Sequence, residues 1–229
     1  MTKQFMKEAI ETLIKRGVAT KEDFSESSVS EQDIAQFEQD FEVKVPDSLK
    51  AYLMTNSFEF YQIMAAVPED CCHGLLPEEE EDYYEMLWLD ILSVPKENPL
   101  SDLRDRMEGF REVIEDGLIE NVSLDDVKHM IPVGDWMAGA GVMVMDLSKP
   151  EENVDIDDED TWNLRWFDHE EFDWDCYRRK DGTISGSSAF PNLETMLNYY
   201  FCGLCDEAYD KQAEEDGEEP IDYSKLIDR

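Results

Sequence analysis

The side chains best suited to bind zinc or to act as thiol or imidazole catalysts are five cysteines and three histidines. Cys202 and Cys205 form a Cys-x-x-Cys pair, which is half of the ligand set that a structural zinc site needs. The other close pair, Cys71 and Cys72, is vicinal and has His73 beside it, so a second pair with zinc-site spacing is missing. The pattern therefore favours two ordinary cysteines of an amphipathic helix over a zinc site.

An acidic run at 155–160 is similar to the start of a calcium-binding loop, but its pattern fails. An EF-hand loop has glycine at its sixth position and glutamate at its twelfth, whereas here Asp160 and Trp166 occupy those positions. His169 stands beside two glutamates and could act as a general base, yet no GxSxG-type nucleophile motif accompanies it. We therefore expect no catalytic residue, no metal site and no cofactor, and keep a metal-dependent hydrolase that uses His169 as a distant alternative.

The charge of the chain indicates the kind of partner that it could bind. Asp and Glu number 57 against 20 Lys and Arg, which gives a net charge of −37 over 229 residues. Such an excess repels nucleic acid and anionic membranes, because binding to either relies on Lys and Arg. It attracts basic protein surfaces and speeds the encounter with them. The composition thus excludes nucleic acid and membranes and points to a basic protein, with plain solubility as the alternative reason for the acidity.

Two acidic runs, and two tryptophans near the second run, are the candidate contact residues for such a partner. Tryptophan is a favoured anchor at protein interfaces, and acidic residues around it would supply a complementary rim. The alternative is that these tryptophans belong to the core of the sheet. The candidate partner-binding residues are Glu78, Glu79, Glu80, Glu81, Asp82, Asp155, Asp157, Asp158, Glu159, Asp160, Trp162 and Trp166.

Helical signals dominate the start of the chain. Apolar residues recur at every third and fourth position over 3–16, which predicts a helix, and the polar stretch that follows is expected to be a linker. A second helix is expected to start at Ser30, where Asp33 completes a capping box. Pro46 fits the first turn of a third helix, since its missing amide costs nothing there. The apolar spacing over 100–117 predicts a fourth helix.

Strand signals are typical of most of the remaining chain, where turn residues separate short apolar segments. The expected strands are 58–67, 86–94, 130–133, 141–147, 164–167 and 183–189. Because short turns cannot join parallel neighbours, the later strands are expected to form an antiparallel meander, which a helix capped by Asn192 follows. The fold class is therefore expected to be α+β, with a mostly antiparallel sheet flanked by N-terminal helices and a closing C-terminal helix.

The composition along the chain also predicts its organisation. We expect an N-terminal helix and linker at 1–29, one α+β domain at 30–209 and an acidic C-terminal tail at 210–229. No apolar run approaches the roughly 18 residues of a membrane helix, and no signal peptide is recognised. The odd cysteine count and irregular cysteine spacing argue against a disulfide framework, which indicates a reducing cytoplasm.

Several residues of the second and third predicted helices carry a resemblance to a known family. They are Ile34, Phe37, Glu38, Val43, Pro46, Leu49, Tyr52 and Leu53, and their spacing resembles the N-terminal signature of the SUKH superfamily. Further on, 131–134, 142–146 and 166–170 are similar to the middle and late strands of that superfamily, and 190–200 to its closing helix. The resemblance covers roughly residues 30 to 205.

The resemblance implies a sheet flanked by helices that serves as a binding scaffold without a catalytic motif. Bacterial members of the superfamily neutralise toxins, frequently nucleases, and its fungal members are cell-wall regulators of the Smi/Knr type. A nuclease is basic where it holds phosphates, so an acidic protein can occupy that surface. The resulting hypothesis is an immunity protein that occludes a basic toxin domain. The alternative is a cytosolic regulatory adaptor, and the oligomeric state is left open.

Overall fold

The computed structural model describes residues 1, 3–15, 19–59, 63–67, 85–136 and 141–202. Its α-helices are α1 (Lys3–Lys15), α2 (Glu31–Phe41), α3 (Asp47–Leu53), α4 (Ser101–Glu115), α5 (Leu124–Val127) and α6 (Leu193–Cys202). Its strands are β1 (Ser25–Glu26), β2 (Asn56–Ser57), β3 (Ile63–Val67), β4 (Glu85–Ile91), β5 (Met130–Trp136), β6 (Gly141–Asp146), β7 (Leu164–Asp168) and β8 (Ser187–Phe190). The connections contain the short 3-10 helices η1 (Lys21–Asp23), η3 (Glu151–Asn153), η4 (Glu159–Thr161) and η5 (Trp174–Tyr177).

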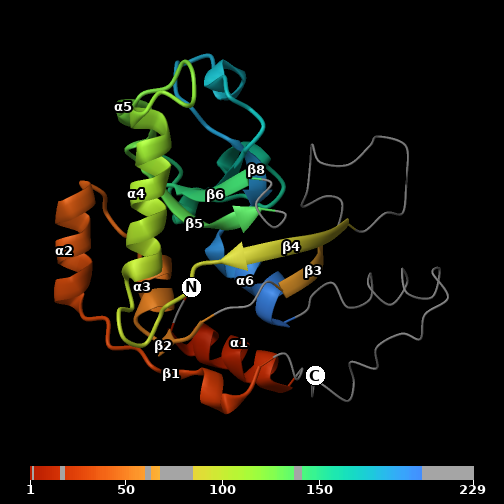
Figure 1. The fold of residues 1–229 in the computed structure, drawn as a ribbon. Helices are drawn as coiled ribbons and strands as arrows, with labels where there is room; N and C mark the ends of the chain where they lie inside the picture. Colours follow the sequence, from red (N-terminus) through yellow and green to blue (C-terminus); the bar gives the residue numbers. More distant parts are fainter. Residues whose placement is uncertain (2, 16–18, 60–62, 68–84, 137–140, 203–229) are drawn as a thin grey trace.

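Strands β3 to β8 form one sheet in chain order, and each strand is antiparallel to its neighbours. The short strands β1 and β2 pair separately. Figure 1 shows α2 and α4 standing side by side on one flank of the sheet and α1 lying below it. The meander and the closing helix α6 confirm the predicted α+β class.

Several strand boundaries differ from the prediction, most of all those of the expected strands 58–67 and 183–189. The expected strand 58–67 is divided. Phe58 pairs with Val94 through two backbone hydrogen bonds of 2.8 and 2.9 Å, whereas β3 begins at Ile63 and pairs with β4. The expected strand 183–189 begins only at Ser187, because Ile184 bridges to Arg178 and closes a turn first. Both differences come from long-range or turn pairing that apolar alternation does not reveal.

The predicted helix starts are confirmed by side-chain hydrogen bonds. The hydroxyl of Ser30 accepts from the Asp33 amide at 3.2 Å, and the Asp33 carboxylate accepts from the Ser30 amide at 2.8 Å. These two bonds satisfy amides that the first turn of α2 leaves free. At α6, the side chain of Asn192 accepts from the Thr195 amide at 2.9 Å.

Both faces of the sheet are buried, because side chains alternate between the two sides along each strand. Met143 and Met145 of β6 belong to the larger core, which also takes in the apolar sides of α1, α2, α3 and α6. Val144 lies between them in sequence and belongs to a smaller core, in which Phe167 and Trp174 stack at 4.1 Å. The end of α4 closes that smaller core.

The predicted domain boundaries at residues 29 and 209 stay predictions. Met6 and Leu13 of α1 lie in the same core as Leu193 and Leu197 of α6, so α1 is packed against the rest of the fold. The tail expected at 210–229 lies outside the described residues.

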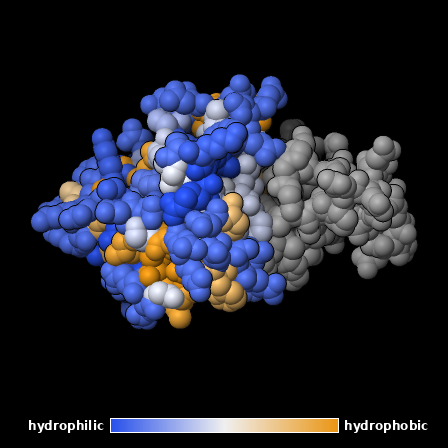
Figure 2. All heavy atoms as spheres, turned by 90° about the horizontal axis from the view of Figure 1, so that it is seen from above, coloured by the Kyte–Doolittle hydropathy of each residue, from blue (hydrophilic) through white to orange (hydrophobic). Residues whose placement is uncertain are grey.

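The excess of acidic residues is carried mainly on the surface. Figure 2 shows one side of the molecule, on which the described surface is largely hydrophilic, with one larger hydrophobic patch and a few smaller ones. Among the described residues, Asp146 and Arg165 are the charged side chains that are buried. None of the described helices combines the length and the apolar character that a membrane crossing requires.

Two glycines give a matched test of how closely the chain packs against β7. A Cβ atom on Gly186 would lie 2.3 Å from the backbone oxygen of Trp166, whereas a Cβ atom on Gly109 of α4 would meet no atom within 4 Å. We expect Gly186→Ala to destabilise the fold by about 1–3 kcal/mol, because the strands must move apart. Gly109→Ala is expected to stabilise it by about 1 kcal/mol through helix propensity. Urea unfolding followed by circular dichroism measures both, and equal stability of the two variants would contradict the strand contact.

Candidate partner-binding site

The acidic run predicted to contact a partner lies in the connection between β6 and β7. Asp155, Asp157, Asp158 and Asp160 are exposed there, and Glu159 is half-buried. The other predicted run, 78–82, lies outside the described residues. The described part of the predicted surface is therefore one loop, 155–160, which we call the acidic loop.

Three cations contact the acidic loop, two of them through its backbone. The Lys149 ammonium donates to the carbonyl oxygen of Asp160. The Arg165 guanidinium donates to the carbonyl of Glu159 at 2.8 Å, and a nitrogen of Arg179 lies 3.7 Å from a carboxylate oxygen of Asp160. Because two of these three cations bind backbone oxygens, they fix the loop without neutralising most of its carboxylates.

Arg165 is the centre of this arrangement. Its side chain comes from the middle of β7 and also donates to the hydroxyl of Ser188 at 2.6 Å. Burial, and then the nearby charge of Arg179, lower the pKa of Arg165 to about 10, so the guanidinium keeps its proton at neutral pH. A permanent positive charge is thus held under a loop whose own carboxylates face solvent.

The acidic loop also stabilises itself. The carboxylate of Asp155 accepts from the Asp157 amide at 3.1 Å, and that of Asp158 accepts from the Asp160 amide at 3.2 Å. Short turns in which Asp binds the amide two residues on are common in loops and need no cation. Among the described residues, no group of three or more His, Cys, Asp or Glu side chains could hold a metal ion.

The two tryptophans predicted as contact residues are buried. Trp162 is 2% exposed and Trp166 is 6% exposed, so neither ring offers much surface to a partner. The indole nitrogen of Trp162 donates to the carbonyl of Asp155 at 3.1 Å, which ties the acidic loop to the core. In this structure these rings are core residues that position the loop, which is the alternative to a contact role that the sequence offered.

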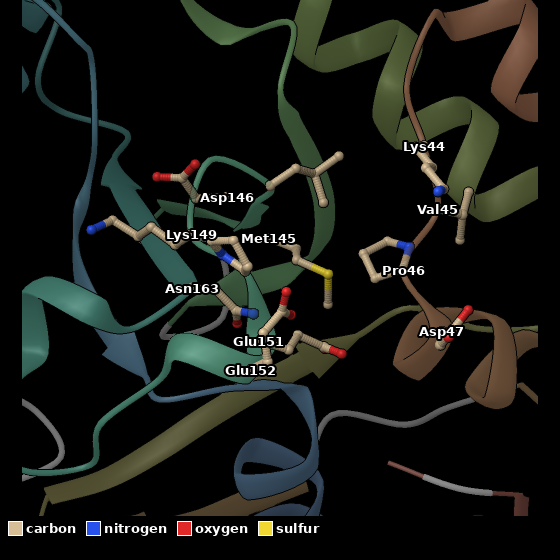
Figure 3. Close-up of a pocket in the computed structure, with 12 residues that line it drawn as sticks. Lys44, Val45, Pro46, Asp47, Met145, Asp146, Lys149, Glu151, Glu152 and Asn163 are labelled. Carbon is tan, nitrogen blue, oxygen red and sulfur yellow. The ribbon is translucent and has the colours of Figure 1, made fainter.

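A cleft of about 450 Å³ lies next to the acidic loop (Figure 3). One wall is Lys44 to Asp47 between α2 and α3, and the other is the end of β6 with the first residues after it, including Lys149 and Glu151. The Ser48 hydroxyl donates to Glu151 and joins the two walls. Because Lys and acidic side chains both line the cleft, it offers a mixed polar surface and no field of one sign.

The turn that forms the first wall is held by residues of the family-like signature. The carboxylate of Glu38 accepts from the Val45 amide at 2.9 Å and lies 3.6 Å from the Lys50 ammonium. The chain can turn there because Glu42 adopts a left-handed conformation with φ 54°. The Tyr52 hydroxyl donates to the carbonyl of Leu92, which anchors α3 to the end of β4. These side chains explain the spacing of the signature in physical terms.

A second concavity, which the sequence did not predict, lies beside α4. This groove of about 460 Å³, called here the α4 groove, has Phe110, Phe167 and Trp174 among its lining residues, which are buried. Leu118 and Phe172 line it as well and are 60% and 61% exposed. A signal in the sequence was the pair of aromatic residues Phe172 and Trp174 within an acidic stretch. His169, the candidate general base, also lines this groove, with its Nδ1 atom 3.8 Å from an Asp168 oxygen.

One end of the α4 groove is lined by Arg106 and Asp135, and Arg106 contacts two further carboxylates there. The Nε atom of Arg106 lies 3.0 Å from Asp102. One of its terminal nitrogens lies 2.6 Å from Asp135, and the other lies 3.6 Å from Asp90. Burial works against the charge of Arg106, but Asp102 and Asp135 outweigh it and raise its pKa. Burial raises the pKa of Asp90, and Arg106 offsets part of that increase. The cluster joins α4 to β4 and β5 and remains acidic overall.

Removing Arg106 should destabilise the fold in a pH-dependent way. We expect Arg106→Met to cost about 1.5–3 kcal/mol at pH 8, the usual range for lost hydrogen bonds to charged groups. Without Arg106 the pKa of Asp90 rises further above its unfolded value. As the pH falls, Asp90 therefore takes up a proton in the folded variant before it does so in the unfolded chain. This stabilises the folded variant, so its loss of stability relative to the wild type shrinks as the pH falls through the raised pKa. Thermal unfolding at several pH values measures this.

Lys128→Met is the control for this prediction. Lys128 forms a single exposed ion pair with Asp125 at 3.3 Å, and such pairs contribute about 0–1 kcal/mol. A deficit of Arg106→Met that is the same at pH 5 and pH 8 would contradict the proposed coupling to Asp90.

Comparison with known proteins identifies the family of the chain. The model of the SMI1 / KNR4 family (SUKH-1) matches residues 28–174, from just before α2 to the start of η5. Comparisons with curated proteins and with solved structures gave no significant match. The match spans more than half of the chain and confirms the SUKH resemblance carried by the α2 and α3 residues. The chain therefore belongs to the SMI1 / KNR4 family (SUKH-1).

Proposed function

We propose that the protein is a cytoplasmic, non-catalytic immunity protein that neutralises a basic toxin domain by occluding its active surface. Family membership supports a binding role, either as an immunity protein or as a regulator of the Smi/Knr type. The observation that carries the choice between them is the net charge of −37. A toxin that cleaves nucleic acid needs a basic substrate surface, and this protein is its electrostatic complement.

Occlusion needs a negative surface whose geometry is fixed before the partner arrives. The acidic loop fits this requirement, because Lys149 and Arg165 hold its backbone while Asp155, Asp157 and Asp158 remain exposed. A preformed negative surface loses little entropy on binding and speeds the encounter with a cation-rich partner. The run at 78–82 would extend the same surface, and its role is part of the proposal.

Binding is favoured over the hydrolase alternative by the surroundings of His169. The side chain is largely exposed on the rim of the α4 groove, and its Nδ1 atom faces Asp168 at 3.8 Å. A general base in a hydrolase needs a positioned nucleophile or an activated water, and the described residues provide no group of metal-binding side chains around it. The proposal therefore assigns no turnover to this site.

The regulatory adaptor remains the second candidate, because the matching family model is named after the SMI1 and KNR4 proteins. The two candidates differ in their genes. An immunity protein is expected beside the gene of its toxin, whereas an adaptor gene has no such neighbour. Expression of the neighbouring toxin domain with and without this protein measures protection directly, and a lack of protection would favour the adaptor.

The electrostatic part of the proposal predicts a loss of association rate in a charge-neutralised loop. We expect Asp155→Asn, Asp157→Asn and Asp158→Asn together to slow association with the basic toxin domain about tenfold at low salt, because steering falls with local charge. The difference should vanish at about 1 M salt, where screening is nearly complete. Stopped-flow association at several salt concentrations measures both effects.

A variant with the same net charge serves as the control. Glu8→Gln, Glu11→Gln and Glu22→Gln remove three exposed charges from α1 and η1, away from the acidic loop. If this variant loses association rate as much as the loop variant does, total charge and not the loop governs the encounter.

A further inference from the structure

We propose that the α4 groove is the docking site for a basic segment of the partner protein that inserts apolar side chains between Leu118 and Phe172. This inference rests on the proposed function and adds to it the place and the chemistry of the central contact. It also separates two tasks, since the acidic loop would steer the partner and the α4 groove would hold it.

The walls of the α4 groove are held in place by contacts between distant parts of the chain. The amide of Glu120 donates to the carbonyl of Phe172 at 2.7 Å, and the amide of Trp174 donates to the carbonyl of Glu120 at 3.1 Å. The side chain of Asn121 donates to Asp173 at 2.8 Å, and Arg178 donates to the carbonyl of Asn121. Leu118 and Phe172 therefore stand on backbone that is fixed on both sides.

This fixed backbone exposes apolar side chains at an energetic cost. Val113, Leu118 and Phe172 are all exposed, and they border a groove whose buried lining is aromatic. Exposed apolar patches that surround a concave site mark binding surfaces in soluble proteins. Binding hot spots are typically such pockets, filled by a large side chain and ringed by polar residues. The α4 groove thus offers the apolar contact that the buried Trp162 and Trp166 do not offer.

The charge around the α4 groove specifies the partner. Segment 112–127, which contains Leu118, has six acidic residues and no Lys or Arg. Segment 166–177, which contains Phe172, has five acidic residues and no Lys or Arg. Arg178, the next residue, pairs with Asp126 and Asp175, so nine of the eleven acidic residues in the two segments do not pair with it. The nearby Arg106 is outnumbered by the three carboxylates around it. An apolar anchor flanked by Lys or Arg would bury the exposed side chains and place its charges against these acidic residues.

The same charge disfavours a second copy of the chain as the occupant. Pairing two such surfaces would bring like charges together around the apolar contact, and each copy carries a net charge of −37. Like-charge contacts across an interface oppose association. A basic partner removes this penalty.

The test uses the full-length protein and three labelled peptides of equal length. One peptide combines lysine and leucine, the second replaces leucine with serine, and the third replaces lysine with glutamate. We expect the lysine–leucine peptide to bind at least tenfold more tightly than either of the others at physiological salt. Fluorescence anisotropy gives the dissociation constants.

Two variants test whether the lysine–leucine peptide binds in the α4 groove. Leu118→Ser together with Phe172→Ser should weaken binding of the lysine–leucine peptide at least tenfold without changing net charge. Ile156→Ser is the matched control, because Ile156 is also an exposed apolar side chain, at 64%, but lies in the acidic loop. Circular dichroism melting checks that all variants are folded, which the exposure of these side chains favours.

Four results would overturn this inference. The first is equal binding of the lysine–serine peptide, which would reduce the contact to charge alone. The second is unchanged binding by the double variant, or an equal loss in Ile156→Ser. The third is a wild-type dimer that the double variant dissociates, which would make a second copy the occupant. Toxin protection that survives in the double variant would reject the groove while leaving the proposed immunity function intact.

Discussion

The excess of negative charge is the constraint on which the rest of this structure depends. With 57 acidic and 20 basic residues, acidic side chains repel one another in the folded chain. Its few cations offset this repulsion where they join helices, strands and loops. Arg104 joins α4 to Asp40 of α2 at 2.8 Å, and Arg106 joins α4 to β5. Arg165 and Arg178 each fix a loop through backbone carbonyls. These arginines thus serve the fold, and most of the exposed charge is acidic.

The family signature has a structural explanation in the turn between α2 and α3. Glu38 binds the amide of Val45 and lies near Lys50, while Tyr52 binds the end of β4. These contacts set where α3 meets the sheet and place Pro46 at the wall of the cleft. The signature therefore describes how the scaffold of this chain is built.

Two surfaces of different physical character emerge on this scaffold. The acidic loop presents charge with its tryptophans turned inward, and the α4 groove presents Leu118 and Phe172 within an acidic rim. Charge at a rim acts mainly on association rate, and buried apolar anchors act mainly on dissociation rate. The immunity function that we propose, rapid capture of a toxin followed by tight binding, would use both.

The sequence alone determined most of the helices and longer strands, the fold class and the charge. The capping box at Ser30, the cap at Asn192 and the antiparallel meander follow from neighbouring residues, whose hydrogen-bonding and apolar spacing are local properties. Only the tertiary structure decided that Trp166 is buried and that Asn121 meets Asp173, 52 residues further along the chain. Such contacts depend on which distant segment packs against which face, and no local pattern of residues specifies that choice.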